Sequence, residues 1–136
     1  FLNIIMERIR KNHICKYQIK KGKSGTRELL ELFKKNFSIA LMIDQRVSEG
    51  ISANFFQRPA KTTTIPAQLV KKYNSRVVPV YIKRVHKYHF ELSFQKPVVF
   101  DKDLTIDEIT LKLNVVLEDM IKKNPSQWIW SHNRWK

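Results

Sequence analysis

The last twelve residues of the chain, PSQWIWSHNRWK, place three Trp among one His, one Arg and one Lys. An indole ring combines a large apolar surface with one N–H donor, so it suits a boundary between apolar and wet surroundings. Residues 125–136 therefore predict one of two structures. One is a closing helix that covers a small core with Trp128 and Trp130. The other is a wedge that lies on a lipid surface.

A carboxylate stands at the end of an apolar run. Residues 38–43 form this run, Asp44 follows it directly, and Gly50 lies in the polar loop beyond. A carboxylate in this place can orient a hydrogen-bond donor, accept hydrogen bonds from backbone amides or pair with an arginine. The structural alternative for Asp44 is a cap or turn residue.

Two further groups of side chains suit an anionic lipid. Phe55 and Phe56 could line a channel for an acyl chain, and Arg58 beside them could meet an anionic headgroup. Arg8 and Arg10 lie on one polar flank of a predicted helix, and a guanidinium binds phosphate through two parallel hydrogen bonds. The alternatives are a core pair next to a turn and a solvated basic face.

One literal match to a His-x-x-x-x-Asp/Glu pattern joins His86 to Glu91. In such a pair the imidazole removes a proton from a hydroxyl, and the carboxylate orients the imidazole. We interpret the match as accidental, because residues at an odd separation on one strand point to opposite faces. Cys15 is the single cysteine, which excludes an internal disulfide and fits a reducing compartment. The four His are dispersed, so we expect no metal site and no cofactor.

Apolar periodicity predicts the elements that must position these residues. Helical spacing predicts helices at 2–11, 27–35, 62–73 and 105–123, the last with a capping box between Thr105 and Glu108. Apolar runs predict buried strands at 38–43 and 76–83, and 86–94 pairs with the second as a hairpin. The alternation predicts a single α/β domain over 1–136 with a mostly parallel sheet flanked by helices. Sites in such sheets collect at the carboxyl ends of strands, where Asp44 lies.

The charge balance narrows the class of partner. The 136 residues carry 26 Lys+Arg against 12 Asp+Glu, a net charge of +14, which attracts nucleic acid, anionic lipid, phosphorylated glycolipid or an acidic carrier protein. The aromatic residues lie mostly in apolar strands or in the ending and not in a basic stripe, so we expect no nucleic-acid partner. A nucleic-acid-binding or anionic-lipid-binding module without catalysis remains the alternative. No apolar run reaches the roughly 18 residues of a membrane span.

The ending resembles the signature Pro-x-Gln-Trp-(Ile/Leu)-Trp-x-His-x-Arg-(Trp/Phe)-Lys of the bacterial lipid A biosynthesis acyltransferases. These are the late, lauroyl/myristoyl-type enzymes of the lysophospholipid acyltransferase superfamily. Other marks follow in the family's order: Asp44-Gln45 after an apolar run, FFQRPA after Gly50, and VVPV before a basic strand. The resemblance covers roughly residues 1–136, and its most specific parts are the ending and the FFQRPA block.

The resemblance implies a glycerol-3-phosphate-acyltransferase-like fold with its N-terminal part missing. It implies transfer of a fatty acyl chain from acyl carrier protein to a hydroxyl of a phosphorylated glycolipid, at the cytoplasmic face of the inner membrane. The family's His-x-x-x-x-Asp/Glu motif precedes the Asp44 block, so we expect the general-base His upstream of Phe1 and no activity from this part alone. Substrate-binding roles are implied for Arg8 or Arg10, Asp44, Gly50, Phe55, Phe56 and Arg58.

Overall fold

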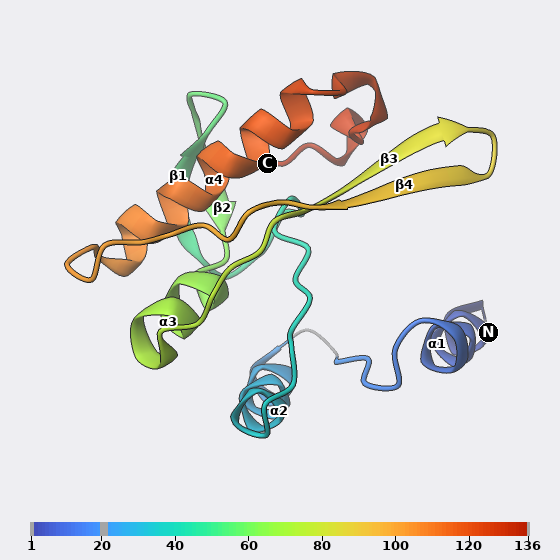
Figure 1. Cartoon of the computed structure of the whole chain (residues 1–136), viewed down its shortest axis with the longest axis horizontal. Helices are drawn as coiled ribbons and strands as arrows, with labels where there is room; N and C mark the ends of the chain where they lie inside the picture. Colours follow the sequence, from blue (N-terminus) through green and yellow to red (C-terminus); the bar gives the residue numbers. More distant parts are fainter. Residues whose placement is uncertain (1, 20–21, 136) are drawn as a thin grey trace. The chain divides into compact units, whose positions relative to one another are not determined.

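In the computed structural model, which describes residues 2–19 and 22–135, the longest helix is α4 (Ile106–Lys122) (Figure 1). The Thr105 hydroxyl accepts a hydrogen bond from the Glu108 N–H at 3.2 Å, and the Glu108 carboxylate accepts one from the Thr105 N–H at 2.7 Å. This is the predicted capping box, which satisfies two N–H groups at the start of the helix. Pro125, three residues beyond the last helical residue, begins a separate turn. The predicted helix at 105–123 is confirmed.

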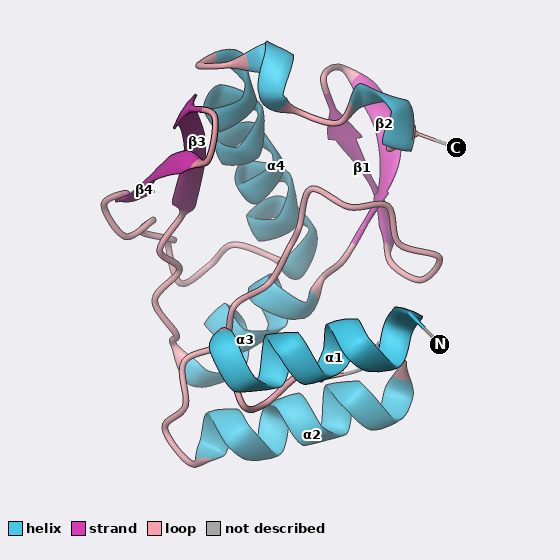
Figure 2. Cartoon of the chain, turned by 90° about the vertical axis from the view of Figure 1, so that its right-hand side faces the viewer, coloured by secondary structure: helices cyan, strands magenta, loops and turns pink. Residues whose placement is uncertain are grey.

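One face of α4 is buried against two neighbouring elements. Its N-terminal half places Ile109 and Leu113 against Ala67 of the helix α3 (Ile65–Tyr73). Its C-terminal half packs on the hairpin of β1 (Ile51–Phe55) and β2 (Arg58–Thr62), which lies beside α4 in both views (Figure 2). The buried residues of this second contact are Phe55, Ala60, Leu117 and Ile121.

The described strands form two antiparallel hairpins. In the first, Phe55 pairs with Arg58, which leaves Phe56 and Gln57 as a two-residue turn. In the second, β3 (Val80–His86) pairs with β4 (His89–Phe94), with an irregularity between Arg84 and His86. The predicted pairing of 86–94 with the preceding strand is therefore confirmed.

The mixture of helices and strands is as predicted, but the mostly parallel sheet is not found in the described residues. Residues 38–42 belong to no helix or strand, and a turn begins at Ile43. The run predicted as a strand at 76–83 becomes a strand only from Val80, and that strand is largely exposed. Short turns join each pair of strands, and a two-residue connection permits only antiparallel pairing. Asp44 consequently lies in a turn and not at the end of a parallel strand.

Helix α3 is shorter than the predicted helix at 62–73, because Thr62 belongs to β2. Pro66 occupies the first turn, where its missing N–H costs no hydrogen bond. Asn74 ends α3 in the left-handed conformation, with φ of 51°, and its N–H donates to the Val70 carbonyl. The helix start is therefore determined by the proline and its end by the asparagine.

Contacts divide the chain into two units, Phe1–Ala40 and Leu41–Lys136. The first unit contains α1 (Leu2–His13) and α2 (Lys23–Lys34), which confirms the predicted helix at 2–11 and extends the one predicted at 27–35. No residue of α1 is buried. The elements that surround Asp44 all belong to the second unit.

We predict that Thr105→Ala lowers the free energy of unfolding by about 1 kcal/mol, because α4 loses its N-cap. Thr105→Ser is the matched control, since its hydroxyl can accept the same hydrogen bond. Urea denaturation at neutral pH measures both. A Thr105→Ala variant as stable as Thr105→Ser would contradict the prediction.

The loss of stability in Thr105→Ala should also depend on pH. Hydrogen bonds from the backbone and side chain of Thr105 hold the pKa of Glu108 below its ordinary value. Because the folded-state pKa is depressed, this stabilisation is present above the pKa of an unfolded Glu, about 4.3, and is lost as the pH falls through the folded-state pKa. The difference between the two variants should therefore shrink on acidification.

Candidate functional site

The C-terminal segment folds as two short 3-10 turns and not as the predicted closing helix. The turns are η1 (Pro125–Gln127) and η2 (Trp130–His132), after which the chain returns to the β1–β2 hairpin (Figure 2). There the Trp135 indole N–H donates to the Phe55 carbonyl at 2.9 Å. The predicted cap over a core is therefore present, but it is built from two turns. Successive side chains in these turns contact different neighbours.

Five aromatic rings, which we call the aromatic cluster, join this segment to the hairpin. Phe55 is fully buried at its centre, 5.7 Å from Trp128 and 5.6 Å from Trp135 between ring centroids. Phe56 lies 4.8 Å from Phe55 and 5.9 Å from Trp130, and Trp130 remains 48 % exposed. The core is thus covered by Trp128 and Trp135, whereas the sequence suggested Trp128 and Trp130.

Arg134 is the largest fully buried side chain in the described residues. Its guanidinium donates to the carbonyls of Lys61 and Ile43 and to the Thr62 hydroxyl, the last at 3.1 Å. It also lies 5.4 Å from the centre of the Phe55 ring, within reach of a cation–π interaction. One side chain therefore connects the C-terminus, the end of β2 and the residue before Asp44.

Burial of this cation is costly, and its surroundings show how the cost is offset. Desolvation lowers the pKa of the Arg134 guanidinium, and the nearby Asp44 carboxylate partly raises it again. A charge out of water needs hydrogen bonds or an opposite charge, and Arg134 has three acceptors and this carboxylate. Asp44 is itself only partly exposed. The two residues are therefore electrostatically coupled although their side chains come from opposite ends of the unit.

The turn that carries Asp44 is bonded from both sides by the C-terminal motif. Arg134 donates to the carbonyl of Ile43 at 3.4 Å, and the N–H of Arg46 donates to Nε2 of His132 at 3.0 Å. Nε2 of His132 is the acceptor of this hydrogen bond. The motif therefore fixes the backbone on each side of the carboxylate.

The Phe56–Gln57 turn has an unusual backbone. Both residues have positive φ, 48° and 60°, as in the type I′ turns that usually require Asn and Gly. Two bulky residues in this conformation are strained and need neighbours to hold them. The N–H of Phe56 donates to the Glu118 carboxylate of α4 at 2.7 Å, and Arg58, next along the chain, lies over the Trp135 ring at 5.2 Å. The turn thus presents Phe56 and Arg58 at one end of the hairpin.

A buried polar group lies beneath the same hairpin. The amide of Asn114, fully buried on α4, donates to the Asn54 carbonyl at 2.9 Å and to the Thr62 hydroxyl at 3.3 Å. Thr62 also donates to the Ala60 carbonyl and accepts from Arg134. Its one donor and two acceptor positions are therefore all used, which fixes β2 between α4 and the C-terminus.

Gly50 allows the loop after Asp44 to approach β2. Its φ is 152°, and a Cβ atom built on it would lie 2.2 Å from the carbonyl oxygen of Thr62. No side chain fits at that distance, so glycine is required by the approach as well as by the backbone angle. Gly50 therefore supports the fold around the Asp44 turn.

The structure brings together five of the predicted site residues. Asp44, Gly50, Phe55, Phe56 and Arg58 all lie in the second unit, around the β1–β2 hairpin and the Asp44 turn. Phe55 belongs to the core, whereas Phe56 is half-buried and Arg58 is exposed.

Arg8 and Arg10 are exposed on α1 in the first unit. The predictions of a substrate-binding role for all seven residues stay predictions.

Sequence reasoning missed the residues that organise the site. These are Thr62, Asn114, Glu118, His132 and Arg134. The signal for two of them was visible, because His132 and Arg134 belong to the signature at the C-terminus. A Thr, an Asn and a Glu in otherwise ordinary strand and helix patterns carry no such signal.

The accidental His-x-x-x-x-Glu match is split between two strands. His86 ends β3 opposite His89, and Glu91 lies on β4 opposite Lys83. Across residues 2–19 and 22–135, no group of three His, Cys, Asp or Glu side chains could hold a metal ion. In the same part of the chain, every helix is too short or too polar to span a bilayer.

The signature at the C-terminus and the FFQRPA block are thus parts of one packed body around Asp44. A family model described as bacterial lipid A biosynthesis acyltransferase matches residues 2–136. The chain belongs to this family. The resemblance seen in the sequence is thereby confirmed. A comparison with curated proteins found no match.

Members of this acyltransferase family act in lipid A biosynthesis, so the substrates are in general terms an acyl donor and a lipid acceptor. Around the Asp44 turn, Asp44 and Phe56 are partly exposed, and Arg58 and Trp130 are exposed.

We predict that Gly50→Ala lowers the free energy of unfolding by clearly more than about 1 kcal/mol, because the new Cβ meets the Thr62 backbone. Asn74→Ala is the control, since that exposed position also has positive φ and so isolates the conformational cost. Urea denaturation followed by Trp fluorescence reports the second unit, which contains all three Trp. Equal losses in the two variants would contradict a steric requirement at Gly50.

We predict that Arg134→Lys costs about 2–4 kcal/mol, because an ammonium cannot reach the acceptors of a planar guanidinium and leaves buried carbonyls unpaired. Arg46→Lys is the matched control, because Arg46 is exposed and its recorded hydrogen bond uses the backbone N–H. The control should change stability by less than about 0.5 kcal/mol. Urea denaturation followed by Trp fluorescence measures both variants. An Arg134→Lys variant as stable as the Arg46→Lys control would show that stability does not require the planar guanidinium.

Proposed function

We propose that the protein transfers a fatty acyl chain from acyl carrier protein to a hydroxyl of a phosphorylated lipid A precursor, at the cytoplasmic face of the inner membrane. Family membership supports the reaction class. The observation that carries the finer proposal is the tethering of the Asp44 turn by His132 and Arg134. A family signature that fixes the backbone around one carboxylate indicates that the position of this carboxylate matters.

Asp44 is proposed to act in the substrate site by orienting a polar group of the substrate. Its carboxylate lies near the buried, positively charged Arg134, and hydrogen bonds from the C-terminal motif fix the turn that carries it. Correct placement of reacting groups is worth large factors in rate, and displacement by about 1 Å can cost roughly 10²-fold. The general base is not assigned to a described residue.

Arg58 and Phe56 are proposed to contact the acceptor lipid. Arg58 is exposed at the end of the hairpin, and its stacking on Trp135 orients a guanidinium that suits a phosphate group. Phe56 and the half-exposed Trp130, 5.9 Å apart, form an apolar surface beside it that suits an acyl chain. A phosphorylated, acylated glycolipid carries both kinds of group.

The acidic acyl carrier protein is proposed as the donor because the chain carries a net charge of +14. Such a field raises the rate at which an acidic partner is captured, and the effect weakens with salt.

The test is transfer of a labelled acyl group from acyl carrier protein to a phosphorylated lipid A precursor by the full-length protein. We expect activity in the unchanged protein and a loss of about 10²-fold in Asp44→Asn. Asp103→Asn is the control, since Asp103 is an exposed carboxylate outside the proposed site and should leave the rate unchanged.

The outcomes separate the parts of the proposal. Full activity in Asp44→Asn would leave Asp44 with only a structural role in its turn. It would not contradict the proposed reaction. Absence of transfer by a folded, full-length protein, with this donor and acceptor, would overturn the proposed reaction and favour a non-catalytic lipid-binding role.

A further inference from the structure

The β3–β4 hairpin exposes an apolar face. The antiparallel register places Val80 opposite Phe94 and Ile82 opposite Leu92. Because opposite residues share a face, these four side chains lie together, and each is 41–71 % exposed. Phe90, 56 % exposed, continues the row opposite Arg84. We call these six residues the apolar ladder: Val80, Ile82, Arg84, Phe90, Leu92 and Phe94.

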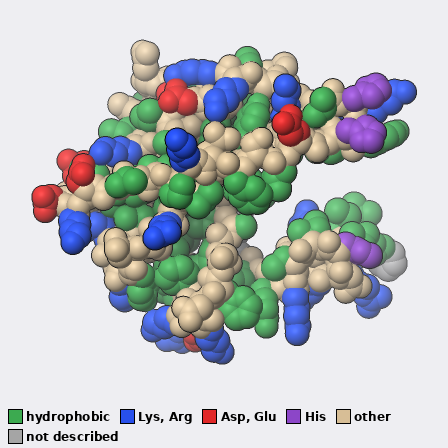
Figure 3. All heavy atoms as spheres, viewed as in Figure 1, with side chains coloured by type: hydrophobic (Ala, Val, Ile, Leu, Met, Phe, Trp, Pro, Cys, Tyr) green, Lys and Arg blue, Asp and Glu red, His purple; other side chains and the backbone are tan. Residues whose placement is uncertain are grey.

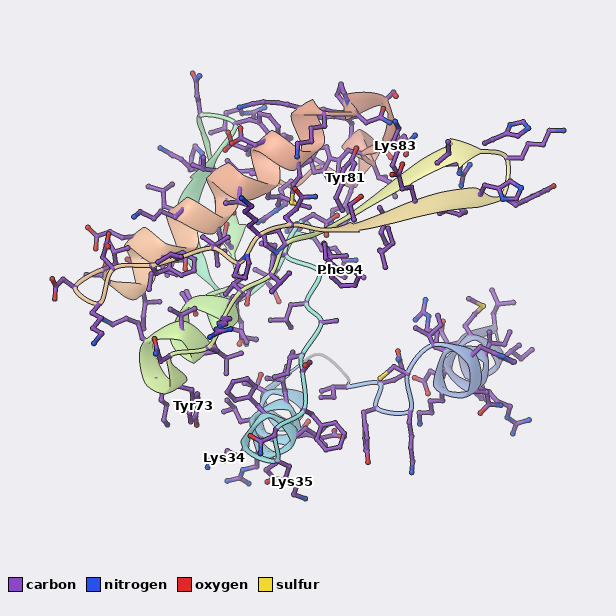
Figure 4. The ribbon with its side chains drawn as sticks, viewed as in Figure 1. Lys34, Lys35, Tyr73, Tyr81, Lys83 and Phe94 are labelled. Carbon is purple, nitrogen blue, oxygen red and sulfur yellow. The ribbon has the colours of Figure 1, made fainter. Side chains whose placement is uncertain are left out.

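The opposite face and one edge of the hairpin are engaged by the rest of the unit. Tyr81 and Ser93 are partly buried, and Figure 4 shows Tyr81 and Lys83 on the other side of the hairpin from Phe94. The Gln127 amide accepts from the Arg84 N–H at 2.8 Å and donates to the Arg84 carbonyl at 2.9 Å. The C-terminal motif therefore fixes the outer edge of β3 and leaves the apolar ladder facing outward.

Cationic and aromatic side chains surround the ladder. Between residues 80 and 96 there are four Lys or Arg and a single acidic residue, Glu91. Figure 3 shows His and basic side chains gathered at the far end of the hairpin. Tyr88 in the turn is 90 % exposed, and the Arg84 guanidinium lies 5.1 Å from the centre of the Phe90 ring. Apolar and cationic groups thus occupy one projecting element.

This combination fits a bilayer surface that carries negative charge. Apolar side chains gain by leaving water, and each Lys or Arg near anionic lipid adds about 1 kcal/mol. Arginine can keep its charge among headgroups while its stem lies in an apolar layer, and tyrosine suits the same depth. A two-stranded hairpin is not a closed sheet, and edge backbone groups that lack a protein partner need water or headgroups, which limits it to the interfacial layer. An acidic protein would match the cations but would leave most of the ladder uncovered.

We propose that the apolar ladder docks the protein onto an anionic phospholipid bilayer, with the ladder in the headgroup region. This inference rests on the proposed function only for the identity of the membrane, because docking requires no acyl donor and no turnover. Lys83 and the Glu91 opposite it lie on the other face of the hairpin and so point away from the lipid.

The experiment is co-sedimentation of the chain of residues 1–136 with vesicles of phosphatidylcholine, alone or mixed with phosphatidylglycerol. We expect binding to the mixed vesicles that weakens at high salt. The test variant is Ile82→Thr, Phe90→Thr and Leu92→Thr together, since threonine keeps strand propensity while removing apolar surface. Its binding should be about tenfold weaker or worse, by the area removed.

A matched control carries Leu111→Gln and Val115→Gln on the exposed side of α4, where the two residues are 41 % and 48 % exposed. This control should bind as the unchanged chain does, and circular dichroism of all variants verifies the fold. Equal binding by the threonine variant would overturn the inference, as would failure of the unchanged chain to bind anionic vesicles.

Self-association that the threonine variant abolishes, without lipid binding, would assign the ladder to a protein interface and also overturn the proposal. Because no acyl donor is present, loss of docking and loss of acyl transfer are measured separately. Membrane docking can therefore fail while acyl transfer is observed, and acyl transfer can fail while docking is observed.

Discussion

The second unit depends on one buried cation. Arg134 is fully enclosed, and its two terminal nitrogens donate to acceptors on Ile43, Lys61 and Thr62. The three acceptors bring the Asp44 turn, the end of β2 and the C-terminus to one point. A buried guanidinium without these acceptors would strongly destabilise the folded state. The three segments must therefore pack together for Arg134 to be buried. The hydrogen bond from Arg134 to the turn that carries Asp44 follows from this requirement.

The rest of the C-terminal motif extends the same arrangement to other segments. Gln127 bonds the backbone of Arg84 in β3, His132 bonds the backbone of Arg46, and Trp135 bonds the backbone of Phe55. Each of these side chains forms a hydrogen bond with the main chain of a distant segment. Although this unit has few strand pairs, the side chains of its C-terminal motif hold several segments in fixed positions.

Local patterns in the sequence were sufficient for part of this result. The helix at 105–123, its capping box and the pairing of 86–94 with the strand before it depend on residues a few positions apart. All three are confirmed, although His86 itself belongs to β3. The parallel sheet was wrong because an apolar run such as 38–43 does not specify a strand partner, and none of its residues is buried here. Of the candidate site, the sequence brought forward Asp44, Gly50 and the FFQRPA block, and it also supplied the family.

What only the tertiary structure decided is the role of the polar residues that hold the site. Arg134 and Ile43 are 91 positions apart, and Asn114 and Asn54 are 60 positions apart. Nothing in the local sequence distinguishes a buried arginine from an exposed one such as Arg58, because burial depends on which acceptors the fold brings near. The sequence by itself determined the main helices, the β3–β4 hairpin and the family, and it singled out Asp44. The contacts that restrain the turn carrying this carboxylate arise from long-range packing, since hydrogen bonds between distant residues leave no periodic pattern in the chain.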